Sequence, residues 1–162
     1  MCRISFALLL AVALFSMGCG RSKTSTGPDG ETTTVTKKGD NVDVTFTGKN
    51  DDKLQITSSE KGVALPDNFP KDAPIYPDAK ATMSTTIPNG FMVMLETNDS
   101  LEQVKEFYED KLKLEGWETE TSLNLPQNTT LANKKDARTL TLTISAGDKT
   151  MIQLLVTQEK EL

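Results

Sequence analysis

The chain has 162 residues and a formal net charge of −5, which is the size of one domain or of one small domain with appendages. The negative charge disfavours binding to nucleic acid, because phosphate recognition needs clustered Lys and Arg. The chain has no histidine, and its two cysteines, Cys2 and Cys19, both lie in the first 20 residues. A disulfide framework in a processed chain is therefore excluded.

Residues 1–18 have the layout of an export signal peptide that is removed from the mature chain. Arg3 supplies a positive charge, residues 6–15 are all apolar, and Ser16 and Gly18 place small side chains ahead of the next cysteine. A helix of this apolar length rises about 15 Å, roughly half the thickness of the hydrocarbon core. We therefore expect cleavage rather than a permanent membrane span.

The residues that precede Cys19 resemble the lipobox of bacterial lipoproteins, in which leucine, a small residue and Gly or Ala come before an acylated cysteine. Gly18 and Cys19 match that pattern, and Ser16 stands in the place of the leucine. The resemblance implies lipid attachment at Cys19 and an exported protein anchored in a membrane, since two or three acyl chains anchor firmly. Ordinary secretion and an uncleaved anchor are the alternatives. The resemblance also implies that Gly20, which is not Asp, permits transfer to an outer membrane if the cell has one, and the choice between inner and outer membrane stays open.

Residues 19–30 follow the signal peptide, contain no apolar residue after the cysteine and are rich in Gly, Ser and Thr. They predict a flexible tether with a reach of about 20 Å. Residues 31–62 then alternate polar and apolar side chains, which predicts a β-meander. We expect its strands near 32–37, 42–47 and 53–58.

Residues 63–79 carry four spaced prolines, which exclude a helix or a central strand and predict an extended strap. We expect Phe69, Ile75 and Tyr76 to anchor this strap to the folded domain. A ligand for a proline-recognition domain is the alternative for such a stretch.

Residues 80–158 give the clearest pattern, and residues 159–162 are a short tail. Alternating side chains on both sides of a Pro-Asn-Gly turn predict a hairpin near 81–95, and a second hairpin closes the chain near 140–156. Between them, residues 98–117 predict a helix. Ser100 and Gln103 form a capping box at its start, and Gly116 ends it.

This order of elements, β-β-α-β-β-β-β, predicts an α+β fold in which an antiparallel sheet is covered by one helix and preceded by the short N-terminal β-meander. The stretch FPKDAPIYPDAK, with the Gly-Trp pair after the helix, resembles a small domain of unassigned function that recurs in bacterial lipoproteins. The resemblance covers about residues 66–157. More loosely, the helix end before a meander resembles helix-grip modules of lipoproteins accessory to envelope assembly.

Recognisable catalytic chemistry is scarce in this sequence. Without histidine there is no ordinary triad and no imidazole base, and no phosphate-binding glycine motif occurs. Glu118 and Glu120 are spaced like a same-face carboxylate pair, and Asp51 and Asp52 could bind calcium weakly in a turn. We interpret both pairs as solvated surface, and we expect a non-enzyme with no cofactor and no metal.

A second apolar face on the predicted sheet is the most informative feature for function. Met92 and Met94 oppose the apolar set of their strand, and Met151 and Leu155 do the same on the last strand. Methionine adapts to irregular partners, so these four residues are the candidate partner-binding face. Three readings stay open: the meander covers the face, a partner or apolar ligand binds it, or threonines leave it merely exposed.

The sequence therefore predicts a lipid-anchored, extracytoplasmic binding or accessory module of the cell envelope. Its expected contacts are the membrane, through Cys19, and an envelope protein as partner. The alternative is a lipoprotein that binds a lipid or another small apolar ligand. The sequence indicates no oligomeric state.

Overall fold

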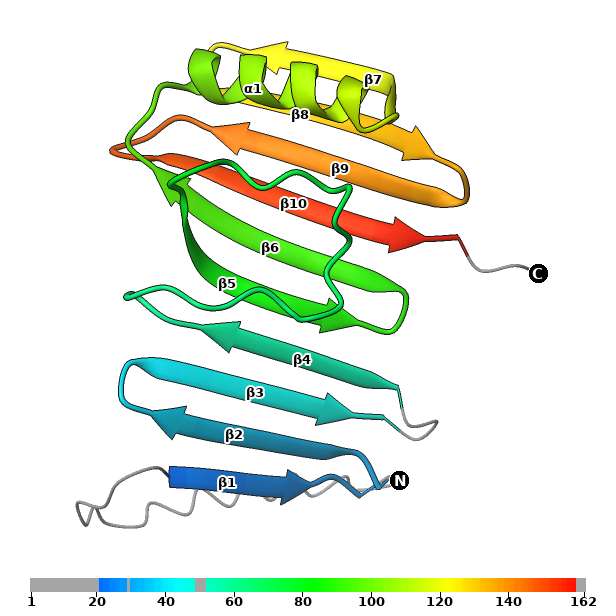
Figure 1. The fold of residues 1–162 in the computed structure, drawn as a ribbon. Helices are drawn as coiled ribbons and strands as arrows, with labels where there is room; N and C mark the ends of the chain where they lie inside the picture. Colours follow the sequence, from blue (N-terminus) through cyan, green and yellow to red (C-terminus); the bar gives the residue numbers. More distant parts are fainter. Residues whose placement is uncertain (1–20, 29, 49–51, 160–162) are drawn as a thin grey trace, which may run out of the picture.

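The computed structural model describes residues 21–28, 30–48 and 52–159. The predicted signal peptide, Cys19 and all but the first residue of the predicted tail lie outside this part of the chain. The described residues form one antiparallel sheet of ten strands and one α-helix (Figure 1). The elements are β1 Arg21–Thr26, β2 Thr32–Lys38, β3 Asn41–Thr47, β4 Lys53–Ser58, β5 Lys80–Ile87, β6 Gly90–Thr97, α1 Leu101–Leu114, β7 Glu118–Leu125, β8 Asn128–Lys135, β9 Arg138–Ser145 and β10 Thr150–Gln158.

The sheet runs in the order β1-β2-β3-β4-β5-β6-β10-β9-β8-β7. After β6 the chain crosses through α1 to the far edge and then returns strand by strand, so that β10 pairs with both β6 and β9. The strap and its flanking residues join β4 to β5, and the remaining neighbours are linked by hairpins or short connections, which suits antiparallel pairing.

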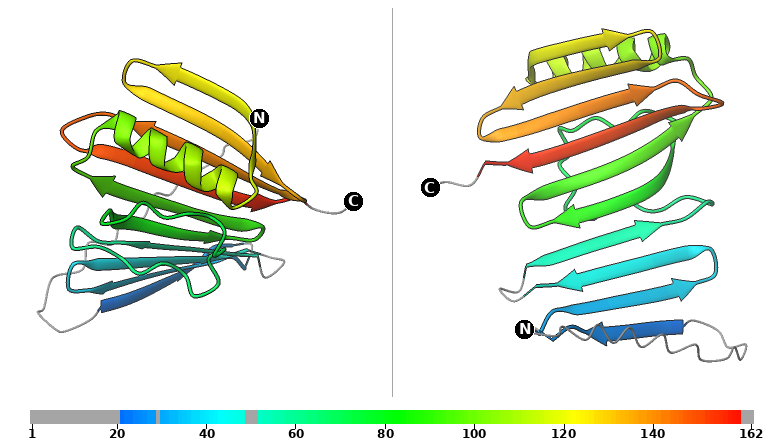
Figure 2. Two further views of the ribbon diagram at one scale, coloured as in Figure 1. Left: turned by 45° about the horizontal axis from the view of Figure 1, so that its top comes forward. Right: turned by 180° about the vertical axis from the view of Figure 1, so that it is seen from behind.

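The predicted fold class, a sheet covered by one helix with a separate meander in front, is wrong. The described chain is mainly one continuous sheet, because β4 pairs with β5 from Gln55↔Thr86 to Ser58↔Met83. The meander satisfies the unpaired edge of β5 instead of stacking on a face. The helix lies over the β9 part of the sheet, and β1–β4 extend well beyond it (Figure 2, left).

The start of the described chain also differs from the expected flexible tether. Arg21–Thr26 form the edge strand β1, which pairs along its whole length with β2. Thr24 and Thr34 share a hydroxyl–hydroxyl hydrogen bond of 3.0 Å across this pair. The strand has no apolar side chain, so the periodicity that marks other strands is invisible here, while the threonines still favour β-structure.

The predicted helix is confirmed together with both of its caps. Ser100 and Gln103 form the capping box, and the helix buries the stripe Leu101, Val104, Tyr108 and Leu112. At the other end Gly116 adopts a φ of 82°, a conformation that favours glycine. The Trp117 backbone N–H then donates to the Leu112 carbonyl at 2.8 Å, which turns the chain into β7.

The hydrophobic core lies between the helix, the strap of residues 63–79 and one face of β6 and β8–β10. The side chains of Val104, Tyr108 and Leu154 are completely buried. The predicted strap anchors Phe69, Ile75 and Tyr76 all pack against this core. The strap crosses in front of β10, β6 and β5 in Figure 1. No helix in the described residues is long and apolar enough to cross a bilayer.

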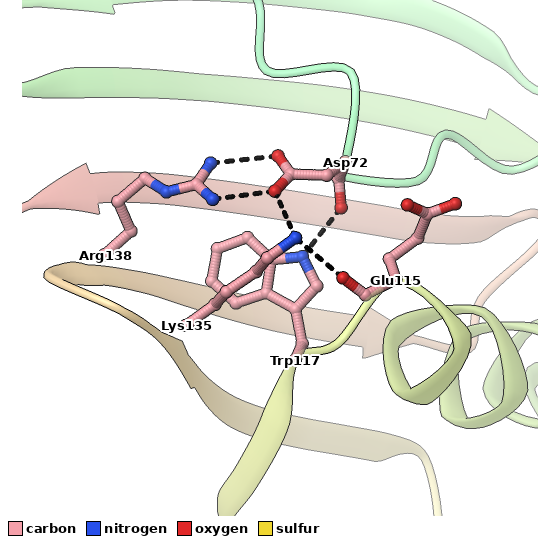
Figure 3. Close-up of polar contacts among 5 residues, drawn as sticks. All are labelled: Asp72, Glu115, Trp117, Lys135 and Arg138. Carbon is pink, nitrogen blue, oxygen red and sulfur yellow. Dashed lines mark hydrogen bonds and ion pairs between the residues drawn. The ribbon is translucent and has the colours of Figure 1, made fainter.

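A polar cluster around Asp72 joins the strap to Trp117 and to the β8–β9 hairpin (Figure 3). Arg138 donates to both carboxylate oxygens of Asp72, at 2.9 and 2.7 Å, and Lys135 donates at 2.6 Å. The indole N–H of Trp117 donates to the Asp72 carbonyl at 2.7 Å. Bidentate pairing with Arg138, assisted by Lys135, holds the pKa of Asp72 far below its usual range.

Replacement of Asp72 tests this fastening. We expect Asp72→Asn to lower the free energy of unfolding at pH 7 by about 1–2 kcal/mol, because two charge-assisted hydrogen-bonding partners lose their anion. The pKa of Asp72 is lowered on folding, so this contribution is fully present above the unfolded value near 4, declines as the pH falls below that value and is lost only as the pH falls through the lower folded value. Urea unfolding at pH 7 and pH 3 should show a larger mutant deficit at pH 7. The exposed Asp67→Asn on the same strap is the control, and an equal deficit at both pH values would contradict the assignment.

Gly90, the first residue of β6, is a second test of the packing. A Cβ at this position would lie 2.0 Å from the backbone oxygen of Val156 on β10, so one strand must move. We expect Gly90→Ala to cost about 3 kcal/mol, the upper end for overpacking, measured by thermal and urea unfolding. Gly147→Ala, whose Cβ would meet only the Lys149 carbonyl at 3.4 Å, is the matched control and should be close to neutral.

Candidate functional site

The candidate site is the open face, which we define as the side of the sheet turned away from α1 and the strap (Figure 2, right). Side chains on a strand alternate between the two faces, and paired residues share one. Val93 and Leu154 are completely buried in the core on the front face. The residues between such positions, including Met92 and Met94, therefore belong to the open face.

The structure brings the four predicted binding residues together on this face. Met92 is paired with Leu155 and Met94 with Gln153, while Met151 is paired with Glu96 at one end of the same strands. All four are partly exposed, not buried. The Gln153 amide donates a weak hydrogen bond to the Met92 sulfur at 3.6 Å, which is the main polar contact among them. On the neighbouring β9 the same face continues as threonines.

The reading in which the meander covers this face is wrong. Since β4 continues the sheet beside β5, the apolar side chains of the meander lie on the open face and extend it. Ile56 is paired with Thr85, which is paired with Met92. A continuous apolar row results, formed by Val35, Val42, Val44, Phe46, Leu54, Ile56, Met83, Ile87, Met92, Met94, Met151 and Leu155.

The opposite side of the meander is polar throughout. Thr57 donates to the Asp43 carboxylate at 2.7 Å, and Thr36 donates to Ser22 at 3.2 Å. Polar side chains such as threonine and serine thus occupy this face of the meander, while Val, Ile and Phe lie on the open face. The meander is therefore an amphipathic part of the sheet, and its apolar side is continuous with the open face.

One pocket of about 600 Å³ indents the open face where β2–β6 meet. Val42, Met83 and Met94 line its apolar part, and Lys37, Asp40, Glu60, Lys80 and Glu96 line its polar part. Glu96 forms ion pairs with Lys80 and, at 2.9 Å, with Lys149. Hydrogen bonds from Lys80, which has the larger effect, and from Lys149 hold the pKa of Glu96 below its usual value. The pocket therefore combines an apolar floor with a charged end.

Thr85 adds a polar group to the apolar row. Its side chain is 3% exposed, and within the described residues its hydroxyl has no hydrogen-bond partner. An unpaired buried hydroxyl costs about 1–3 kcal/mol. Because Thr85 is paired with Ile56 on one side and Met92 on the other, this unpaired hydroxyl is buried within the apolar row.

The other candidate residues do not form a reaction centre in the described part of the chain. Glu118 and Glu120 are exposed on the edge strand β7, and a bulge at Glu120 interrupts their alternation. No group of three Cys, Asp or Glu side chains there is placed to hold a metal ion. Asp51 lies outside the described residues, as does Cys19.

Sequence reasoning missed two features of the site: the strand β1 and the pairing of the meander with β5. The strand β1 carries no apolar side chain, and the alternation within the meander does not indicate which strand it pairs with. The shared parity of Val42, Val44 and Phe46 with Ile56 was visible in the sequence, but their position beside Met92 depends on the β4–β5 register.

These observations define an antiparallel sheet protein with one packed helix and one apolar face left open. The chain belongs to the START domain-like family, whose model matches residues 78–158, half of its length. The match covers the strands β5–β10 and α1, much as the predicted resemblance did, but under a different family description. No curated protein and no solved structure matches the chain significantly.

Proposed function

We propose that the protein is a lipid-anchored binding module of the bacterial cell envelope that holds a protein partner on its open face without catalysing a reaction. The observation that carries this proposal is the continuous apolar row from β2 to β10. Rows of this extent on a folded surface are typical of interaction sites. The partner best suited to it is an extended apolar segment of another envelope protein.

Methionine at the centre of the row supports a binding role. Met83, Met92 and Met94 are flexible and polarizable, so they can follow the contour of a partner that is itself irregular. The surrounding threonines keep the free protein soluble without filling the face.

A small amphipathic ligand is the second candidate, and the START domain-like match favours a ligand-binding module. The space between helix and sheet does not offer the room, because Val104, Tyr108 and Leu154 fill it completely. The pocket on the open face does, with Val42, Met83 and Met94 for an apolar tail and Lys80 and Glu96 for a polar head.

Anchoring at Cys19 is tested by substitution with a matched control. We expect wild-type protein to partition into detergent in Triton X-114 extraction, with a mass that exceeds the polypeptide by its acyl chains. Cys19→Ser should lose the acyl mass and accumulate uncleaved, since the thioether needs the sulfur. Cys2→Ser should behave as the wild type. A Cys19→Ser protein that keeps the membrane location and mass of the wild type would refute the anchor.

Binding at the open face is tested by photocrosslinking in cells. A benzophenone amino acid at Met94 or Leu155 should give a discrete protein adduct, at least five times stronger than the same group at Thr45, which lies on the polar face of the meander. An adduct of lipid mass at Met94 would favour the small-ligand candidate. Equal labelling from both faces, or none from either, would contradict a binding role for this face.

A further inference from the structure

The end of the open face nearest the N-terminus has a character of its own, which we call the basic corner. It consists of Arg21 and Lys23 on β1, Lys37 and Val35 on β2, and Phe46 on β3. Arg21 is paired with Lys37 and Lys23 with Val35, so these side chains share the open face. The ladder also places Phe46 on this face, because Val35 is paired with Val44, two residues away from it on β3.

The apolar members of the basic corner are the most exposed of the apolar row. Val35 is 37% exposed and Phe46 is 39% exposed. Both lie within two strands of the cations, so the corner offers apolar and positive groups to one occupant. This combination is the one that favours binding at the headgroup level of a bilayer.

The charges on the two sides of this ribbon are segregated. On the open face of β1–β3 the charged side chains are Arg21, Lys23 and Lys37, all cations. The acid of β3, Asp43, points to the polar face, where Thr57 donates to it at 2.7 Å. At the β2–β3 turn, Asp40 is paired with Lys61 at 2.6 Å. The strands β1–β3 therefore carry only positive charges on the open face although the whole chain has a net charge of −5, and the nearest acids, Asp40, Glu60 and Glu96, lie around the pocket that Lys37 also lines.

The short distance in sequence between Cys19 and β1 supports a membrane as the occupant of the basic corner. Cys19 is two residues ahead of Arg21, the first residue of β1. A residue spans at most about 3.6 Å, so the Cα atoms of Cys19 and Arg21 lie within about 7 Å of each other. Acyl chains on Cys19 would thus hold β1 at the bilayer surface, where a long tether would have released it.

We propose that the basic corner seats the protein on an anionic bilayer surface, with Arg21, Lys23 and Lys37 against lipid headgroups and Val35 and Phe46 at the interface. This seating rests on the proposed lipid anchor at Cys19. Neighbouring strands rotate by roughly 20–25°, so four steps from β2 to β6 turn the face by roughly a right angle. The Met92 region therefore stays accessible while β1–β3 lie on the membrane.

The experiment uses lipidated protein reconstituted into vesicles and an environment-sensitive fluorophore on a single introduced cysteine. Mass spectrometry first verifies the acyl group at Cys19, so a failed anchor is recognised before seating is measured. Thr33→Cys places the probe on the open face beside Phe46, and Thr45→Cys places it on the polar face. In vesicles with 30% phosphatidylglycerol, quenching by a nitroxide lipid should be at least threefold stronger at Thr33→Cys than at Thr45→Cys.

The charges provide the decisive comparison. The triple variant Arg21→Gln, Lys23→Gln and Lys37→Gln should lose the difference between the two probe positions, as should 0.5 M salt or purely zwitterionic vesicles. The matched control is Lys71→Gln, Lys111→Gln and Lys113→Gln, which removes the same charge from exposed positions elsewhere and should keep the difference. Equal quenching of both probes on the acylated protein would overturn the seating. A difference that grows with protein density and persists without anionic lipid would assign the corner to a second copy and also overturn it.

Discussion

The pairing of β4 with β5 is the constraint on which the rest of the structure depends. Four residue pairs join the two strands, and the backbone N–H groups of Ser59 and Val63 extend the contact by donating to the carbonyls of Thr82 and Ala81 at 3.1 and 2.8 Å. Had the meander stacked on the sheet, its valines would have buried the methionines of β6. Because it pairs edge to edge, both sets of apolar side chains stay on one surface, and the molecule keeps an apolar face much wider than the helix-covered domain would have alone.

The face of the sheet that packs against α1 and the strap is closed, which leaves the open face as the candidate for function. The strap brings Tyr76 onto the helix, where its backbone N–H donates to the Tyr108 hydroxyl at 3.2 Å and its own hydroxyl donates to Asp99 at 2.8 Å. Burial raises the pKa of Tyr108 above that of a free tyrosine, and the hydrogen bond that its hydroxyl accepts from Tyr76 helps to close this side of the core. Asp72, four residues before Tyr76, also fastens the strap to Arg138 and Trp117, and the fully buried side chains of the core leave a ligand no room beneath the helix.

Local features of the sequence predicted local structure well. The capping box at Ser100, the glycine at 116 and the alternation around Pro88 each depend on neighbours a few residues away, and each element forms as expected. Sheet assembly depends on pairs far apart in the chain. Nothing in residues 53–58 indicates whether they bond to residue 86 or cover residue 92, because the same alternation serves both arrangements. The polar strand β1 has the sequence of a tether because it buries no apolar side chain, and backbone pairing with β2 and hydroxyl hydrogen bonds hold it in the sheet. The candidate face was therefore recognised in its four central residues but not in its extent.

The distribution of threonine shows how one ribbon can serve two environments. On the polar face of the meander threonines pair with each other and with Asp43, so hydrogen bonding is met without an apolar core. On the other face valine, isoleucine and phenylalanine replace them, and the cations stand only at the outer strands. A ribbon built for solubility alone would need no such division, since threonine suits both sides of an exposed sheet. This division fits the proposed contact of the open face with lipid or protein, and the basic residues lie at the end of the sheet closest in sequence to Cys19.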